Sequence, residues 1–130
     1  MKKIILDTNA FMAISEMGLD IFSAINEACN FKYKLFVLQG TVKELEMIVQ
    51  EQRGRFKQGA KLALTLLKKK LENCELEIMN NPIPEKYVDD NLVILSKEGY
   101  LVLTQDVVLK RKLTKPYLTI RQKKKVMVVE

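Results

Sequence analysis

Apolar residues follow two different patterns along this chain. Short apolar runs bounded by polar residues are typical of strands that are buried on both faces of a sheet. One such run ends abruptly at Asp7, and another is followed by Gln105 and Asp106. From these runs we expect strands at residues 3–6, 35–38, 75–78, 100–104, 117–120 and 126–129, with 75–78 the weakest and 126–129 at an edge.

The segments between these runs have apolar residues spaced three or four apart, which indicates helices with one buried face. Gly18 is expected to divide the first helical segment into two, and Gly99 to end a later helix. Thr41 and Glu44 match a capping box at the start of another helix. We therefore expect helices within residues 10–30, from 41 towards 50, and at 60–71, 87–97 and 107–113, with a loop or loosened helix end at 53–59.

Strands that alternate with helices predict an α/β fold. The expected architecture is a three-layer α/β/α sandwich around a central, mostly parallel sheet. A length of 130 residues suits one sizeable core, so we assign residues 1–130 to a single domain.

The composition is that of an ordinary globular protein, with 48% hydrophobic and 29% charged residues. Asp7 and Asn9 interrupt the first apolar run too early for a signal peptide, and no run is long enough to span a bilayer. The two cysteines, Cys29 and Cys74, match no metal or redox motif. We therefore expect a soluble, cytoplasmic protein with reduced thiols and no membrane association.

The net charge of +6 is unevenly distributed. Residues 107–129 contain eight basic and no acidic side chains, whereas the chain without this tail and Glu130 is close to neutral. A second acid-free stretch, residues 53–70, contains seven basic side chains. Such separation suits a polyanionic partner held by basic flanks around an acidic centre, and it equally suits a lysine-rich surface that is merely solvated.

Acidic residues occur where a parallel sheet collects its chemistry, just beyond the carboxyl ends of strands. Asp7 and Asp106 each follow a predicted strand, so both are expected at the same edge of the sheet. Helices that follow strands begin at this edge, and two of them carry Glu44 and the pair Asp89 and Asp90 near their starts. Crowded carboxylates repel one another, and a hard divalent ion such as Mg²⁺ or Mn²⁺ offsets that repulsion.

The absence of histidine excludes histidine acid–base catalysis and histidine zinc sites. An acidic cluster between basic flanks then favours metal-assisted hydrolysis of phosphodiester bonds, which leaves 5′-phosphate and 3′-hydroxyl ends. Asn9 and Thr104 are candidates for orienting Asp7 or a water, and a local turn role suits each equally well. Each acid also has a simpler explanation as a helix cap or as a complement to a helix dipole.

The ordered motifs Leu6-Asp7-Thr8-Asn9, Glu44-Leu45, Asp89-Asp90 and Thr104-Gln105-Asp106 resemble those of the PIN-domain ribonucleases, over essentially the whole chain. The likeness is greatest to small archaeal PIN proteins related to those that process ribosomal RNA. Gln105 stands where relatives often have asparagine or a basic residue. A helix points Asp89 and Asp90 about 100° apart, so the third acid of the set stays open between them.

The resemblance implies an α/β/α nuclease that uses Mg²⁺ or Mn²⁺ and acts on RNA. Its metal ligands and catalytic groups would be Asp7, Glu44, one or both of Asp89 and Asp90, and Asp106, with Asn9 and Thr104 as supporting polar groups. It also implies a homodimer, and a protein partner that is either an antitoxin, as in toxin–antitoxin pairs, or a component of ribosome assembly.

We therefore expect a metal-dependent endoribonuclease that acts in RNA processing or as a toxin. The alternative is a catalytically weak or inactive PIN-like protein that binds RNA in ribosome assembly or as a scaffold. Phosphatases of the haloacid type are disfavoured because Asn9 stands where they need an acid, and receiver domains because residues 75–79 lack an aspartate. The basic residues expected to hold RNA are Arg53, Arg55, Lys57, Lys110, Arg111, Arg121 and Lys123.

Overall fold

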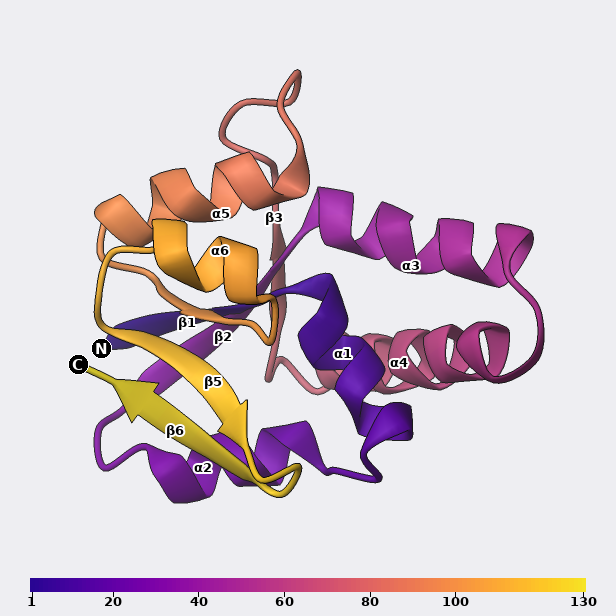
Figure 1. Cartoon of the computed structure of the whole chain (residues 1–130), viewed down its shortest axis with the longest axis horizontal. Helices are drawn as coiled ribbons and strands as arrows, with labels where there is room; N and C mark the ends of the chain where they lie inside the picture. The colour runs from indigo at the N-terminus through magenta and orange to yellow at the C-terminus, as the bar shows by residue number, and fades with distance from the viewer.

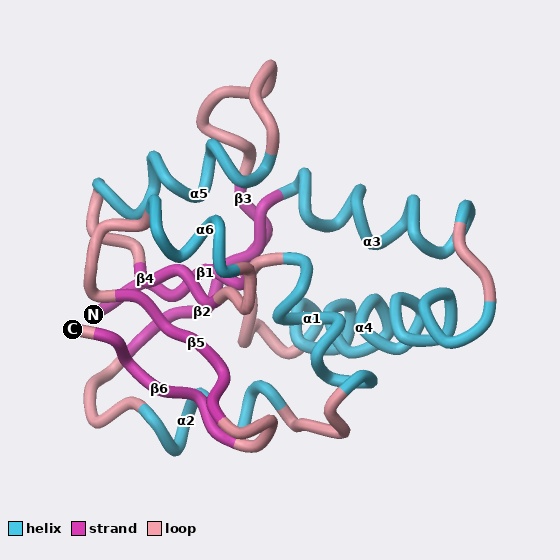
Figure 2. The backbone as a smooth tube through the Cα atoms, in the orientation of Figure 1, coloured by secondary structure: helices cyan, strands magenta, loops and turns pink.

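One six-stranded sheet forms the centre of the computed structural model, which describes all residues 1–130. The strand order is β3-β2-β1-β4-β5-β6, and only the edge pair β5 and β6 is antiparallel (Figure 2). The strands are β1 (Lys2–Leu6), β2 (Tyr33–Leu38), β3 (Glu77–Met79), β4 (Leu101–Leu103), β5 (Tyr117–Arg121) and β6 (Lys125–Val129). The mostly parallel sheet is therefore confirmed, including the edge position of the last strand.

Six helices connect and cover the strands (Figure 1). They are α1 (Thr8–Glu16), α2 (Ile21–Ala28), α3 (Gln39–Glu51), α4 (Gly54–Glu72), α5 (Val88–Lys97) and α6 (Val107–Lys112). The core residues of α1, α2 and α4 pack on one face of the sheet, and those of α5 and α6 pack on the other. α3 packs along α4, and the two extend away from the sheet as a hairpin (Figure 1). The three-layer α/β/α sandwich is confirmed.

Alternate residues of the buried strands serve the two layers of the core. On β1, Ile4 and Leu6 belong to the cluster with α1, α2 and α4, whereas Ile5 belongs to the cluster with α5 and α6. All three side chains are fully buried. The buried part of β1 is wholly apolar, and so the acid that directly follows it marks the carboxyl-end edge of the sheet.

The strand order reverses next to β1. The chain passes from β1 to β2 and β3 on one side and returns through β4, β5 and β6 on the other. In open α/β sheets a crevice forms at the carboxyl ends of the strands where the order reverses, and ligands bind there. Asp7 directly follows β1, and Asp106 follows the end of β4. The fold therefore brings both acids to this crevice.

The predicted capping box at the start of α3 is wrong. The helix begins two residues before Thr41, which is fully buried and whose hydroxyl has no hydrogen-bond partner. The start of α3 is held instead by Asn81, whose side-chain oxygen accepts a hydrogen bond of 3.0 Å from the Gly40 amide. Because Asn81 lies 41 residues away in the sequence, the local pattern around Thr41 gave no sign of this contact.

The predicted loop at residues 53–59 is largely helical, because α4 already begins at Gly54. At Gly59 the helix lies against α1 so closely that a Cβ atom would collide with the Ser15 hydroxyl. Gly59 therefore serves helix packing, whereas Gly54 has a positive φ of 63° where the chain enters the helix. The third strand, Glu77–Met79, begins two residues later and ends one residue later than expected. No helix is both long enough and apolar enough to cross a membrane.

Candidate active site

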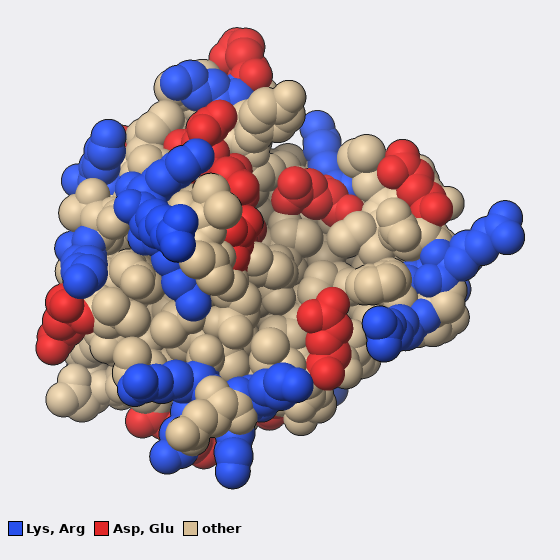
Figure 3. All heavy atoms as spheres, in the orientation of Figure 1, with Lys and Arg blue, Asp and Glu red and all other residues tan.

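A cleft of about 600 Å³ opens at the carboxyl ends of the strands. Its lining contains six acidic side chains and no lysine or arginine. Figure 3 shows acidic side chains around a hollow in the middle of this face, with basic side chains farther out. The lining residues are Asp7, Thr8, Asn9, Met12, Glu16, Glu44, Met47, Ile48, Glu51, Gln52, Phe56, Asp89 and Asp106. Four of the five predicted site acids therefore line one cleft, which we call the acid cleft.

Asp7 is the buried carboxylate of the acid cleft, with 4% of its surface exposed. Its Oδ2 atom accepts a hydrogen bond of 2.8 Å from the Thr104 hydroxyl, and its Oδ1 atom accepts one of 2.7 Å from the Thr8 amide. Burial raises the pKa of Asp7 to about 6, because it outweighs these two bonds and is reinforced by the charges of Asp89 and Glu44. Keeping Asp7 ionised in the folded protein therefore costs free energy.

Thr104 connects Asp7 to the loop that follows β4. Its hydroxyl has one proton, which the shorter distance assigns to Asp7, although Asn9 Oδ1 lies only 3.2 Å away. The same hydroxyl accepts a hydrogen bond of 3.1 Å from the Asp106 amide, and Asn9 Oδ1 accepts one of 3.0 Å from the Gln105 amide. Thr104 therefore contacts both Asp7 and the loop that carries Asp106, whereas Asn9 contacts Thr104 and this loop.

Asp106 is the N-cap of α6. Its Oδ1 atom accepts hydrogen bonds of 2.9 Å and 3.1 Å from the amides of Val108 and Leu109. Asp7 likewise occupies the N-cap position of α1. Both acids therefore do cap helices, as the simpler explanation expected. Capping uses only one carboxylate oxygen of Asp106, and the second oxygen stays available to the cleft.

Glu44 lies in the second turn of α3 and accepts a hydrogen bond from the Thr8 hydroxyl. Thr8 begins α1 and neighbours Asp7, so this bond joins the two helices that form opposite walls of the acid cleft. The sequence motif contained Thr8, but nothing in the sequence indicated a bond to a residue 36 positions away.

Gln105 is a second residue to which the sequence assigned no role. Its Oε1 atom accepts hydrogen bonds of 2.8 Å from the Thr119 hydroxyl and 2.7 Å from the Ile120 amide. β4 ends at Leu103, which pairs with Leu118, whereas β5 continues beyond that point. The Gln105 side chain thus replaces the missing strand beside β5, and it fixes the residue next to Asp106. Strand lengths of this kind are not visible in a sequence.

Of the acidic pair on α5, Asp89 lines the acid cleft and Asp90 does not. Burial raises the pKa of Asp89, the charges of Asp106 and Asp90 raise it further, and Lys112 opposes them. The turn of about 100° between successive helical residues accounts for the difference in direction. We therefore favour Asp89 over Asp90 as the acid of the site, because Asp90 does not line the cleft.

Asn91, which the sequence did not single out, fixes the start of α5. Its side chain is fully buried. Its Oδ1 atom accepts a hydrogen bond of 2.7 Å from the Ile83 amide, and its Nδ2 atom donates one of 3.0 Å to the Ile83 carbonyl. A buried amide that is bonded in this way ties the preceding loop to the start of α5. It thereby also fixes the position of Asp89, which lies two residues earlier on the same helix.

The donor chemistry of the acid cleft fits a hard divalent cation, because its four predicted ligands, Asp7, Glu44, Asp89 and Asp106, offer only carboxylate oxygens. None of them forms an ion pair, since the only ion pair in the structure joins Lys70 and Glu75. No three acidic side chains, however, lie close enough together to form a complete metal site. The exposed side chains on α3 and α5 would have to turn towards Asp7 to enclose an ion.

None of the seven basic residues expected to hold RNA lines the acid cleft. They lie on three segments: the start of α4, the last turn of α6 and the β5–β6 turn. Figure 3 shows basic side chains surrounding the acidic hollow on this face. In this order, the three groups are Arg53, Arg55 and Lys57; Lys110 and Arg111; and Arg121 and Lys123.

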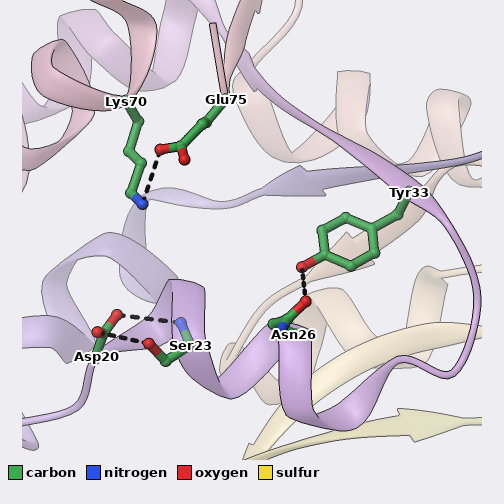
Figure 4. A network of polar contacts seen from close by, with 6 residues as sticks. All are labelled: Asp20, Ser23, Asn26, Tyr33, Lys70 and Glu75. Atoms are coloured by element: carbon green, nitrogen blue, oxygen red, sulfur yellow. Dashed lines mark hydrogen bonds and ion pairs between the residues drawn. The ribbon is translucent and has the colours of Figure 1, made fainter. Parts of the chain in front are cut away.

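A larger cavity, of about 810 Å³, lies at the opposite ends of the strands and includes the starts of β1, β2 and β3. We call it the far cavity. Figure 4 shows that six of its polar residues bond in pairs: Asp20 accepts from Ser23, Tyr33 donates to Asn26, and Lys70 pairs with Glu75 at 3.0 Å. Polar groups that satisfy each other give no indication of a ligand.

The sequence and the fold match those of known proteins. Residues 4–123 match the family described as "PIN like domain", and the chain belongs to that family. Over 129 residues it is 30% identical to Ribonuclease VapC4 of Methanocaldococcus jannaschii, covering 95% of this chain and 94% of that protein. The solved structure of the PIN domain endonuclease Utp24 has the same fold, with a TM-score of 0.75 over 97% of this chain and 90% of that one, at 23% identity. The family expected from the motifs is confirmed.

Proposed function

We propose that this protein is a divalent-metal-dependent endoribonuclease and that the acid cleft is its active site. The observation that carries the proposal is the burial of Asp7 beside Asp89 and Glu44 with no lysine or arginine within 4.0 Å. A carboxylate in this position raises the free energy of the folded protein, unless a bound cation compensates its charge. Such an arrangement is typical of functional sites rather than of a stabilising core.

Two further observations support RNA as the substrate. A relative that covers almost the whole chain is named a ribonuclease. In addition, three groups of basic side chains lie around the acid cleft but not in it. Basic residues in these places would attract the phosphates on either side of the cleaved bond, while the acids remain free to bind metal.

Asp7, Glu44, Asp89 and Asp106 are the proposed metal ligands. When bound, a Mg²⁺ or Mn²⁺ ion would supply a reactive water and neutralise the charge that develops on the phosphate. The Thr104 hydroxyl and the Thr8 amide orient the Asp7 carboxylate, and the Thr8 hydroxyl orients Glu44. Asn9 and Gln105 hold the loop that presents Asp106. These residues preorganise the acids, so that fewer side chains have to move when the ion binds.

The test is a cleavage assay on single-stranded RNA with Mg²⁺ or Mn²⁺, comparing the wild type with Asp106→Asn. Asparagine is as good an N-cap as aspartate, so the substitution keeps α6 and removes only the charge. We expect a loss of activity of about 100-fold or more, and products with 5′-phosphate and 3′-hydroxyl ends. Glu75→Gln, which removes an acid from the far cavity, is the matched control and should leave the rate unchanged.

Equal cleavage by the wild type and Asp106→Asn would refute the proposed active site. Salt-sensitive RNA binding without cleavage in either metal, on RNAs of varied structure, would instead favour the alternative of an inactive RNA-binding scaffold. The homodimer, the antitoxin or ribosome-assembly partner and the single domain spanning residues 1–130 remain predictions of the sequence. Light scattering of the purified chain tests the first of these directly.

A further inference from the structure

Phe56 is the one aromatic residue among those that line the acid cleft. It lies in the first turn of α4, with 45% of its surface exposed, and it lines the acid cleft together with the proposed metal ligands. Tyr87, Val107 and Val108 are more exposed, but none of them lines the cleft. A large side chain that stays half in solvent inside a binding cleft is a candidate contact for a ligand.

The position of Phe56 follows from the direction of the helices. α1 and α3 both run outward from the strand ends, and their cleft-lining residues recur at helical spacing. Along α3 the lining passes from Glu44 through Met47 and Ile48 to Gln52, a rise of roughly 12 Å, before Phe56 follows at the start of α4. Phe56 therefore lies at the outer end of the cleft, beyond the end of α3 and away from Glu44.

The surroundings of Phe56 favour an uncharged aromatic group rather than a phosphate. Glu16 and Glu51 line the same outer part of the cleft and would repel phosphate, whereas Met47 and Ile48 offer apolar contacts. The Arg55 guanidinium lies over the Phe56 ring, 5.4 Å from its centre. A nucleobase inside the cleft with its phosphate outside, towards the basic residues, satisfies both sets of charges.

We propose that Phe56 is a stacking platform for an unpaired nucleobase of the bound RNA, one that makes the acid cleft selective for an unpaired strand at this nucleotide. The proposal rests on RNA as the substrate and adds a binding subsite to the proposed function. Every base has a stacking face, so the platform contributes affinity without demanding one sequence. In a duplex, both faces of a paired base already stack on neighbouring bases, so no face is left to stack on Phe56.

The test measures binding of the full chain to a short single-stranded RNA that carries the fluorescent base 2-aminopurine at one position after another. Ca²⁺ replaces Mg²⁺ so that binding is followed without turnover. We expect Phe56→Ala to weaken binding about 10-fold to 100-fold and to abolish the fluorescence quenching seen at one position in the wild type. Phe56→Trp, which keeps a stacking face, should restore both.

Leu62→Ala is the matched control, because Leu62 is similarly exposed on the same helix but lies outside the cleft. Equal affinity of Phe56→Ala and Leu62→Ala for single-stranded RNA overturns the proposal and leaves the ring as a contact for a protein partner. An equal loss of affinity for duplex RNA also overturns it. Cleavage that is unimpaired by Phe56→Ala would refute the platform alone, whereas Phe56-dependent binding without any cleavage would refute only the nuclease.

Discussion

The acid cleft and the far cavity lie at opposite ends of the same strands and differ in how their charges are treated. The far cavity is the larger, at about 810 Å³ against about 600 Å³. It contains acids and lysines in similar numbers, and Lys70 both pairs with Glu75 and lies 4.9 Å from the centre of the Phe22 ring. In the acid cleft, by contrast, all the charged side chains of the lining are acidic.

The two regions differ in their electrostatics as well as in their size. In the far cavity hydrogen bonds from Ser23 lower the pKa of Asp20, so its charge is accommodated. In the acid cleft burial raises the pKa of Asp7 to about 6, so its charge is opposed. A site that is kept electrostatically unsatisfied is ready for an external cation, and the smaller of the two hollows is the one with this property.

Removing the charge of Asp7 should stabilise the metal-free protein. The pKa of Asp7 is about 6 when folded and near 3.8 when unfolded, so the folded state binds more protons in between and stability falls as pH rises through this window. At about pH 8 in EDTA, Asp7→Asn should raise the free energy of unfolding by up to about 3 kcal/mol, and the gain should vanish near pH 4. Urea unfolding at both pH values measures this.

The Thr104 hydroxyl keeps Asn9 Oδ1, 3.2 Å away, as an acceptor in the Asp7→Asn variant, so loss of one hydrogen bond does not mask the effect. A variant that is less stable than the wild type at the higher pH would show that the Asp7 charge is compensated, and the contrast between the two regions would fail.

Addition of Mg²⁺ or Mn²⁺ should have the second largest effect. An ion that binds only the folded protein stabilises it by about 2–3 kcal/mol at a concentration of about 100 times its dissociation constant. We expect this gain for the wild type, a smaller one for Asp89→Asn and an undiminished one for Asp90→Asn. Thermal unfolding with and without metal distinguishes the three. An equal response of Asp89→Asn and Asp90→Asn would contradict the choice of Asp89.

In the far cavity, removal of an acid should instead lower the free energy of unfolding. Asp20 is the N-cap of α2, and its oxygens accept hydrogen bonds from the amide and the hydroxyl of Ser23. Asp20→Ala should therefore destabilise the protein by about 1 kcal/mol at neutral pH. Because the folded pKa of Asp20 is lowered, its charge contributes stability above the unfolded pKa, and this contribution is lost as the pH falls through the folded value. A stabilising Asp20→Ala would erase the difference between the regions.

The smallest effect is expected from the Lys70–Glu75 ion pair, whose side chains are 29% and 51% exposed. Water screens a pair of this kind, so Glu75→Gln should cost less than about 1 kcal/mol. It should also leave the stabilisation by Mg²⁺ unchanged, which thermal unfolding checks. A lost metal response in Glu75→Gln would mean that the metal binds in the far cavity.

The sequence by itself determined the order of strands and helices, since burial on both faces leaves its mark as an unbroken apolar run and one-sided burial as a helical repeat. It also determined that Asp7 and Asp106 emerge at the same edge, because this follows from parallel strands whatever their order. The family followed from four short motifs in a fixed order, and the match over residues 4–123 confirms it.

Only the tertiary structure decided which side chains meet in the cleft. The direction of Asp89, the bond from Thr8 to Glu44 and the role of Gln105 beside β5 depend on residues that lie far apart in the chain. The wrong cap at Thr41 has the same cause, because Asn81 reaches the helix start from another loop. A sequence records local periodicity, whereas contacts between distant segments depend on strand lengths and helix rotations that are fixed only when the core packs.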